Sequence, residues 1–325
     1  MGVTTPRLRR DIRPKPASRT GDRVLLALCV IAGLIVAVTL VDIGYQLVHN
    51  SRPAIDKFGL GFLVHANWAP NFRVFGAADM IVGTVVSSLI AIVIAAPLGL
   101  AIAVYLSMIA PKRVSGIVGP LVEMLAAVPS IIYGFWGVVV LAPFIQKIEP
   151  GLHNALGFIP LFGAPQTTGI GMLTAGLVLT LMILPIMSAL SRDVFLTVPR
   201  ELTEGAEALG ATRWEVIRGI MLPSTISGVT AATVLALTRA LGEAIAVSLV
   251  IGDANGIHAN LFLPASTLAE RIANQFPSAV NSLHTASMFY CGLILLVICL
   301  FTSLAARAIA GRFDVERGYA RAVAA

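Results

Sequence analysis

The chain has 325 residues, of which 57% are hydrophobic and only 12% are charged. Soluble domains carry about 25% charged residues, so this composition excludes an ordinary soluble protein and indicates one that lies mostly in lipid. The formal net charge is +6, but the basic residues lie between apolar segments, as membrane orientation requires, and we expect no nucleic-acid partner. The three cysteines lie in apolar runs without CxxC spacing, which argues against a disulfide framework and a zinc site.

Six apolar segments are long enough to cross a bilayer as helices, for which about 20 residues are needed. They lie near 24–41 and within 80–110, 121–144, 169–190, 224–251 and 283–306. The first segment is longer than the apolar part of a signal peptide and lacks a cleavage site, so we interpret it as an uncleaved span. The sequence therefore predicts an all-α, polytopic membrane protein with six transmembrane helices.

The predicted parts follow one another in a simple order. They are a disordered basic tail (1–23), a first transmembrane helix (24–48), an external loop (49–79), a core of five further transmembrane helices (80–310) with a polar hairpin (199–223), and a second tail (311–325). If the N-terminus is cytoplasmic, 17 of the 23 Lys and Arg residues fall in inner segments and five in outer ones. This asymmetry predicts a plasma-membrane protein with both termini and the hairpin in the cytoplasm.

The hairpin is two short helices joined at a glycine. Gly210 suits the left-handed conformation that closes a helix, and Thr212 followed three residues later by Glu215 predicts a capping box. Pro223 is expected to end the second helix or to bend it into the fifth span. Along that helix, one apolar stripe is expected at Trp214, Ile217 and Met221. The stripe either packs on its own subunit or docks into a groove of a cytoplasmic partner.

The residue pattern of this hairpin favours docking. Glu204, Ala206, Gly210, Ile220, Leu222 and Pro223 match, at the same spacing, a pattern of E-A-A, three residues, G, nine residues and I-x-L-P. This stretch resembles the EAA loop of ABC importer permeases, with Gly205 in place of the middle alanine. The resemblance implies the type I permease fold, and it implies that the hairpin, Trp214 included, forms a coupling helix that sits in a cleft of an ATPase subunit.

The chain lacks the residues needed to bind ATP itself. It has four lysines and none follows a glycine, so the G-K-[ST] of a phosphate-binding loop is missing. We therefore expect no cofactor and no catalysis in this chain, with ATP and magnesium bound by a partner ATPase. An intramembrane enzyme is disfavoured because no HExxH and no paired aspartates occur within the spans.

Two charges lie four residues apart in the fifth apolar segment. Arg239 and Glu243 are expected near the middle of one helix and on one face of it. One interpretation is a structural ion pair that holds neighbouring spans together. The other is that Arg239 presents its donor fork to a passing oxyanion while Glu243 orients it. Both interpretations can hold at different stages of a cycle.

The sequence around this pair, R-A-L-G-E, resembles the oxyanion branch of these permeases, and A-V-P-S-I-I-Y-G-F-W-G in the third span resembles their phosphate permease subunits. Pro129 is expected to kink that span, and Ser130 and Tyr133 either offer hydroxyls to the path or serve packing. The resemblance implies a phosphate importer with a homologous second permease, two ATPase subunits and an external phosphate-binding protein. Sulfate or molybdate import, and an ion-coupled transporter acting alone, are the alternatives.

Overall fold

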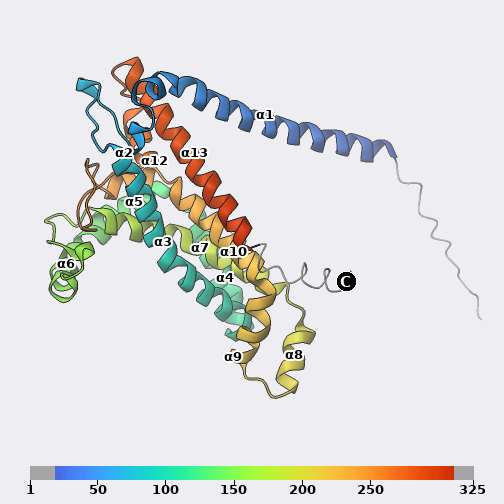
Figure 1. The fold of residues 1–325 in the computed structure, drawn as a ribbon. Helices are drawn as coiled ribbons and strands as arrows, with labels where there is room; N and C mark the ends of the chain where they lie inside the picture. The colour runs from blue at the N-terminus through green and yellow to red at the C-terminus, as the bar shows by residue number, and fades with distance from the viewer. Residues whose placement is uncertain (1–18, 311–325) are drawn as a thin grey trace, which may run out of the picture. The chain divides into compact units, whose positions relative to one another are not determined.

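The computed structural model describes residues 19–310, which are helical with short connections (Figure 1). These residues fall into two units, the first ending at Gln46 and the second beginning at Leu47. The predicted tail at 311–325, and residues 1–18 of the predicted N-terminal tail, lie outside the described residues. Within 19–310 there is no β-strand, only two isolated bridges. The predicted all-α class is therefore confirmed.

Thirteen α-helices follow one another along the described chain. They are α1 (Arg19–Phe58), α2 (Gly61–Val64), α3 (Ala78–Val104), α4 (Lys112–Ala126), α5 (Ser130–Trp136), α6 (Ala142–Leu156), α7 (Met172–Leu196), α8 (Arg200–Ala208), α9 (Arg213–Val216), α10 (Leu222–Leu241), α11 (Ile245–Val250), α12 (Leu268–Gln275) and α13 (Ser282–Ala310). Short 3-10 turns lie at Pro70–Phe72 and Pro160–Phe162. Six helical segments among the described residues are long and apolar enough to span a membrane: Gly21–Phe58, Ala78–Ile109, Ser130–Leu156, Met172–Leu196, Arg213–Leu241 and Ser282–Ala308. The predicted number of spans is confirmed.

The first helix is longer than the sequence predicts. We expect a loop from residue 49, whereas α1 continues to Phe58 and is followed by the short helix α2. The last turns of α1 pack into an apolar cluster, where Ala54 is fully buried and Phe58 lies against Phe62 and Phe75, with ring centroids 6.0 Å apart in both pairs. Burial of this apolar face stabilises the additional turns.

The third span begins later than predicted. Residues 121–126 belong to α4, which ends before Pro129, and the span itself is Ser130–Leu156. Pro129 has φ −55° and ψ 137°, so it separates two helices instead of kinking one. The physical reason is local: the proline ring disfavours helical backbone at the preceding residue, Val128. Residues 145–156, which lie beyond the predicted end of this segment at residue 144, are the last turns of α6.

Three prolines each lie two residues after a π-helical turn. The turns are Tyr105–Ile109, Gly137–Leu141 and Ile217–Met221, and the prolines are Pro111, Pro143 and Pro223. At Pro143 and Pro223, which lie within continuing helices, the proline lacks an N–H and its ring clashes with the carbonyl four residues earlier, and a wider turn relieves that clash. Pro111 instead follows the end of its helix, with extended backbone at Ala110 and Pro111. Pro223 therefore does not end the second helix of the hairpin, because the helix continues through the π turn into α10.

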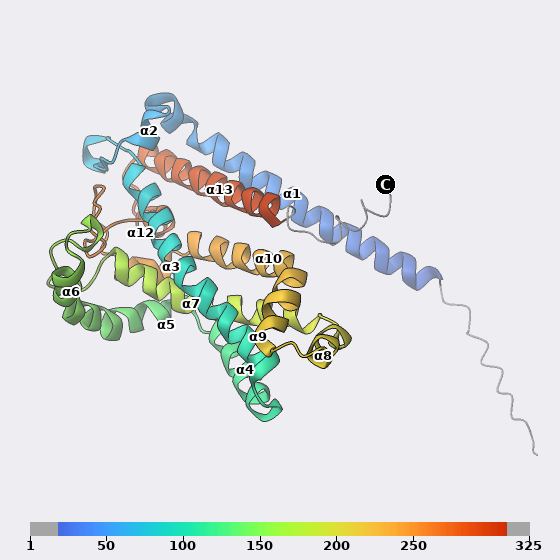
Figure 2. The same ribbon diagram turned by 60° about the horizontal axis from the view of Figure 1, so that its bottom comes forward.

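The core of the second unit is built from α3, α7 and α10 (Figure 2), together with α11. Small residues allow α3 and α7 to approach closely. A Cβ on Gly99 of α3 would lie 2.7 Å from the side chain of Met187, and one on Gly176 of α7 would lie 2.6 Å from that of Ile90. In a membrane protein, packing of this kind holds helices together, because lipid offers no hydrophobic driving force between them.

A polar cluster joins α12 to the loop that follows α11. Arg271 pairs with Asp253 at 3.0 Å and donates to Asn255 at 3.0 Å and to Ser266 at 2.6 Å. The neighbouring Glu270 is fully buried. Burial, together with the nearby Asp253 carboxylate, raises the pKa of Glu270 to about 7, against the lowering effect of Arg271. The cluster holds this loop against the helical core.

We expect this cluster to make stability depend on pH. The folded-state pKa of Glu270 lies above its ordinary value, so its stabilising contribution is present at low pH and is lost as pH rises through about 7. The unfolding temperature should therefore fall between about pH 4.5, the ordinary pKa of this carboxyl, and about pH 7, its folded-state pKa, and Glu270→Gln should flatten this fall. Thermal unfolding across this range checks it, with the exposed Glu201→Gln as control. An unchanged slope in Glu270→Gln would contradict the prediction.

Candidate functional site

The turn between α8 and α9 is closed by backbone hydrogen bonds. Gly210 has φ +91°, its N–H donates to the carbonyl of Glu207 at 3.0 Å, and the N–H of Ala211 donates to the carbonyl of Ala206 at 3.0 Å. This is the Schellman arrangement, which satisfies the last carbonyls of a helix and requires a residue that tolerates positive φ. The predicted role of Gly210 as the end of the first hairpin helix is confirmed.

The second helix of the hairpin starts with the predicted capping box. The N–H of Thr212 donates to Oε2 of Glu215 at 2.7 Å, and the N–H of Glu215 donates to the hydroxyl of Thr212 at 3.4 Å. Two backbone donors at the helix start are satisfied in this way. Both ends of the turn are thus fixed by local bonds, so the hairpin keeps its shape without a partner.

The predicted apolar stripe does not lie on one face. Ile217 and Met221 are buried in a cluster with Ala103 and Phe195, whereas Trp214 is 65% exposed. The prediction of a single stripe is wrong, because Ile217 and Met221 pack in the cluster with Ala103 and Phe195 whereas Trp214, in α9, does not join it. Sequence reasoning also missed Leu209, which is 91% exposed at the hairpin tip.

The other hairpin residues divide between surface and core. Glu204 and Gly205 are exposed on α8, and Pro223 is exposed at the start of α10. Ile220 is half-buried, and Leu222 packs against the cluster around Phe195. The surface that the hairpin offers therefore consists of α8, the tip and the start of α9 (Figure 1). Its large exposed apolar side chains are Leu202, Leu209 and Trp214.

Replacing Gly205 with alanine should stabilise α8. A Cβ at this position meets nothing within 4 Å, and glycine inside a helix costs about 0.5–1 kcal/mol relative to alanine. Hydrogen exchange of the α8 amides measures the effect, and Gly205→Ala is expected to slow it by about two- to fivefold while transport is retained. Faster exchange would show that α8 is not the helix described here.

Arg239 and Glu243 do not share a continuous helix. Arg239 lies in the last turn of α10, whereas Glu243 lies in a break at 242–244 before α11. The expected single span at 224–251 is therefore wrong. Gly242 ends α10, and the break turns the carboxylate of Glu243 toward the next helix. Its Oε1 accepts a hydrogen bond from the N–H of Ala246 at 3.1 Å.

The two side chains of this pair have opposite environments. The Arg239 side chain is 49% exposed and that of Glu243 is 6% exposed, and Nη2 of Arg239 lies 4.0 Å from Oε2 of Glu243. This distance is the limit for an ion pair, and it leaves most of the five guanidinium donors without a partner among residues 19–310. The arrangement is a fixed carboxylate beside a guanidinium that is available to bind an anion.

Two glycines of the third span hold the break in place. A Cβ on Gly134 of α5 would lie 2.9 Å from both the Cα and the carbonyl oxygen of Ala246. One on Gly137 would lie 2.7 Å from Val178 and 2.8 Å from Val250. These glycines allow close helix approach, which fixes the start of α11, where Glu243 accepts its hydrogen bond.

The predicted hydroxyls of the third span are not joined to this pair. Tyr133 donates to the carbonyl of Leu125 at 2.7 Å, and so satisfies the end of α4. The Tyr133 side chain lines an apolar cavity of about 370 Å³. No hydrogen bond within residues 19–310 joins Tyr133 or Ser130 to Arg239 or Glu243. Their role in a substrate path therefore stays a prediction, and the Tyr133 bond supports packing.

A further ion pair was missed by sequence reasoning. Arg192 of α7 pairs with Glu123 of α4 at 3.1 Å, and a Cβ on Gly119 would lie 2.7 Å from the Arg192 guanidinium. The residues are 69 positions apart in the chain, so no local pattern could have joined them. The pair links α4 to α7 at a position six residues before Pro129 in the chain.

A family model described as the inner membrane component of binding-protein-dependent transport systems matches residues 95–315. The chain belongs to this family. The matched range contains the hairpin, the Arg239–Glu243 pair and five of the six membrane-spanning helices in whole or in part. The predicted resemblance to importer permeases is confirmed.

Similar proteins are phosphate permease subunits by name. The phosphate transport system permease protein PstC of Mesorhizobium japonicum is 42% identical over 302 residues, covering 91% of this chain and 92% of that one. PstC of Pasteurella multocida is 42% identical over 279 residues, covering 84% and 86%. PstC 2 of Mycobacterium tuberculosis is 38% identical over 308 residues, covering 93% and 94%. These matches confirm the predicted resemblance to phosphate permease subunits.

Solved structures share the fold of this permease. A bacterial alginate ABC transporter, solved with an alginate-bound periplasmic protein, has a chain that matches with a TM-score of 0.61 at 16% identity, covering 91% of this chain and 96% of that one. The methionine transporter MetNI, in an inward-facing conformation, matches with a TM-score of 0.51 at 21% identity, covering 73% and 94%. At these identities the likeness establishes the helical fold of an importer permease.

Proposed function

We propose that this chain is a membrane subunit of an ATP-driven importer and carries inorganic phosphate into the cell. The PstC relatives, which match over most of their length, support phosphate as the substrate. The same relatives disfavour the alternative of sulfate or molybdate import. The proposal requires a path for an oxyanion, a surface that binds the ATPase subunits, and further partner subunits.

The observation that carries the proposal is the exposed guanidinium of Arg239 beside the break in the helix. Guanidinium binds two oxygens of a phosphate group at once, with hydrogen bonds stronger than those between neutral groups. Glu243 is held by the N–H of Ala246, so it limits the approach of Arg239 without occupying all of its donors. A charge within a membrane is costly unless it faces a cavity or a partner, and a passing phosphate is such a partner.

The hairpin is the surface that we propose binds the ATPase subunit. Its rigid turn presents Leu209 and Trp214, and its α9 helix continues through the π turn into α10, which carries Arg239 in its last turn. A movement of the hairpin is therefore transmitted along one helix to the oxyanion site. ATP and magnesium are bound by the ATPase subunits in this proposal, and no cofactor is assigned to this chain.

The proposed assembly has four kinds of component. A homologous second permease completes the path, two ATPase subunits bind the hairpins, an external binding protein delivers phosphate, and the lipid bilayer surrounds the spans. The count of basic residues supports cytoplasmic termini in the plasma or inner membrane. The external loops would then lie on the side of the binding protein.

Competition between anions tests the substrate. Vesicles that contain the complete complex should take up labelled phosphate, and excess unlabelled phosphate should suppress this uptake. Sulfate and molybdate at the same excess should leave it nearly unchanged. Suppression by sulfate or molybdate as strong as that by phosphate would replace the proposed substrate with the wider oxyanion class.

A further inference from the structure

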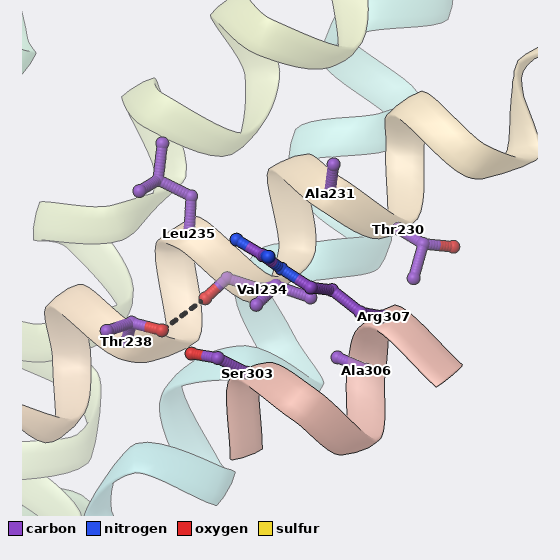
Figure 3. A pocket seen from close by; sticks show the side chains of 8 residues that line it. All are labelled: Thr230, Ala231, Val234, Leu235, Thr238, Ser303, Ala306 and Arg307. Atoms are coloured by element: carbon purple, nitrogen blue, oxygen red, sulfur yellow. Dashed lines mark hydrogen bonds between the residues drawn. The ribbon is translucent and has the colours of Figure 1, made fainter. Parts of the chain in front are cut away.

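A groove between α10 and α13 contains an arginine from one wall and hydroxyls from both (Figure 3). Thr230 and Thr238 belong to α10, and Ser303 and Arg307 belong to α13. The cavity has a volume of about 320 Å³, which is the volume of roughly ten water molecules at about 30 Å³ each. It is large enough for a tetrahedral phosphoryl group with part of its hydration.

Arg307 differs from the arginines that form ion pairs in the described chain. Those arginines each face a carboxylate, in the pairs Arg192–Glu123, Arg239–Glu243 and Arg271–Asp253. Arg307 has no ion pair or hydrogen bond within residues 19–310. The two wall helices, α10 and α13, contain no aspartate or glutamate in their described lengths. The groove therefore has a positive charge without a counter-ion among the described residues.

The available donors of the groove can be counted. Thr230 donates to the carbonyl of Ile226 at 2.7 Å, and Thr238 donates to that of Val234 at 2.9 Å. Ser303 makes no hydrogen bond to any described residue, so its O–H is free to donate. Arg307 reaches from α13 across the groove toward α10 (Figure 3). Arg307 and Ser303 together are complementary to an anion that accepts several hydrogen bonds.

We propose that this groove binds a phosphoryl oxyanion through the guanidinium of Arg307 and the hydroxyl of Ser303. Two sources can supply that group. One is the headgroup of an anionic phospholipid, which an arginine in the last turn of a spanning helix reaches readily. The other is inorganic phosphate that has left Arg239, the residue that follows Thr238 on α10. Only the second source rests on the proposed function.

Two measurements on the complete complex test this inference and separate the sources. For the lipid, native mass spectrometry counts phosphatidylglycerol and phosphatidylcholine retained from mixed nanodiscs. Arg307→Gln should lower phosphatidylglycerol affinity about fivefold, the effect typical of one basic residue at an anionic surface, and should leave phosphatidylcholine unchanged. For inorganic phosphate, uptake into vesicles made without anionic lipid should fall by a similar factor.

Matched variants distinguish loss of binding from loss of folding. Arg307→Lys keeps the charge and should retain most of the lipid binding, and Ser303→Ala should weaken binding less than Arg307→Gln. Weaker phosphatidylglycerol binding by Arg307→Gln identifies the lipid headgroup as the ligand. Lower phosphate uptake by this variant in vesicles without anionic lipid identifies inorganic phosphate. If Arg307→Gln changes neither measurement in a complex that assembles normally, the inference is wrong. Absence of phosphate uptake by the unaltered complex would overturn the proposed function, and unchanged uptake by Arg239 variants would overturn only the role of Arg239. Neither result would alter the lipid measurement.

Discussion

Replacing Arg239 with alanine is expected to lower ATP-driven phosphate uptake by about 10²-fold or more, because each charge-assisted hydrogen bond to phosphate is worth about 1.5–3 kcal/mol. The complex should still assemble, since the guanidinium is half exposed and its ion pair is at the distance limit. Labelled phosphate uptake into vesicles, together with co-purification of the partner subunits, measures both effects.

Two further variants give this prediction its specificity. Arg239→Lys keeps the charge but loses the planar donor fork, so its uptake should lie between those of the wild type and of Arg239→Ala. Arg52→Ala removes an exposed arginine from α1 and should leave uptake unchanged. Normal uptake by Arg239→Ala would mean that this guanidinium does not bind the transported anion.

Replacing Leu209 and Trp214 together with alanine is expected to weaken binding of the ATPase subunits by at least tenfold. Large apolar side chains at the centre of an interface commonly contribute about 2 kcal/mol or more to binding. Both side chains are exposed in this chain, so its own stability should change little. Quantitative co-purification with the ATPase subunits measures binding, and thermal unfolding measures stability.

Ile217→Ala is the matched comparison for the hairpin. Ile217 is buried beside Phe195, so its truncation creates a cavity and should destabilise the chain by about 2–5 kcal/mol. The two sets of variants should therefore show opposite patterns, one in binding and the other in stability. ATPase binding that survives the loss of both Leu209 and Trp214 would place the docking surface elsewhere.

Features that depend on local sequence could be predicted. The positive φ of Gly210 and the capping box of Thr212 and Glu215 follow from the few residues around them. The number of spans follows from apolar length, and the family follows from the spacing of the hairpin residues. Each of these depends on neighbouring residues in the chain, which is the information that a sequence displays directly.

Features that depend on residues distant in the sequence could not be predicted. The fifth segment is apolar on both sides of 242–244, so hydropathy alone does not reveal the break that separates Arg239 from Glu243. Trp214 is exposed and Ile217 is buried, and this difference depends on contacts with Ala103 and Phe195 on other helices. A signal for the break did exist, since Gly242 follows the last turn of α10 and glycine commonly ends a helix.

The most direct test of the central claim is phosphate accumulation in vesicles with and without the ATPase subunits. The account predicts accumulation only when the ATPase subunits and ATP are both present, because the path lies in the permeases and the hairpin transmits movement from outside the chain. Vesicles that lack the ATPase subunits should accumulate no phosphate under an imposed ion gradient. Accumulation under that gradient would contradict the account and assign the chain to ion-coupled transporters.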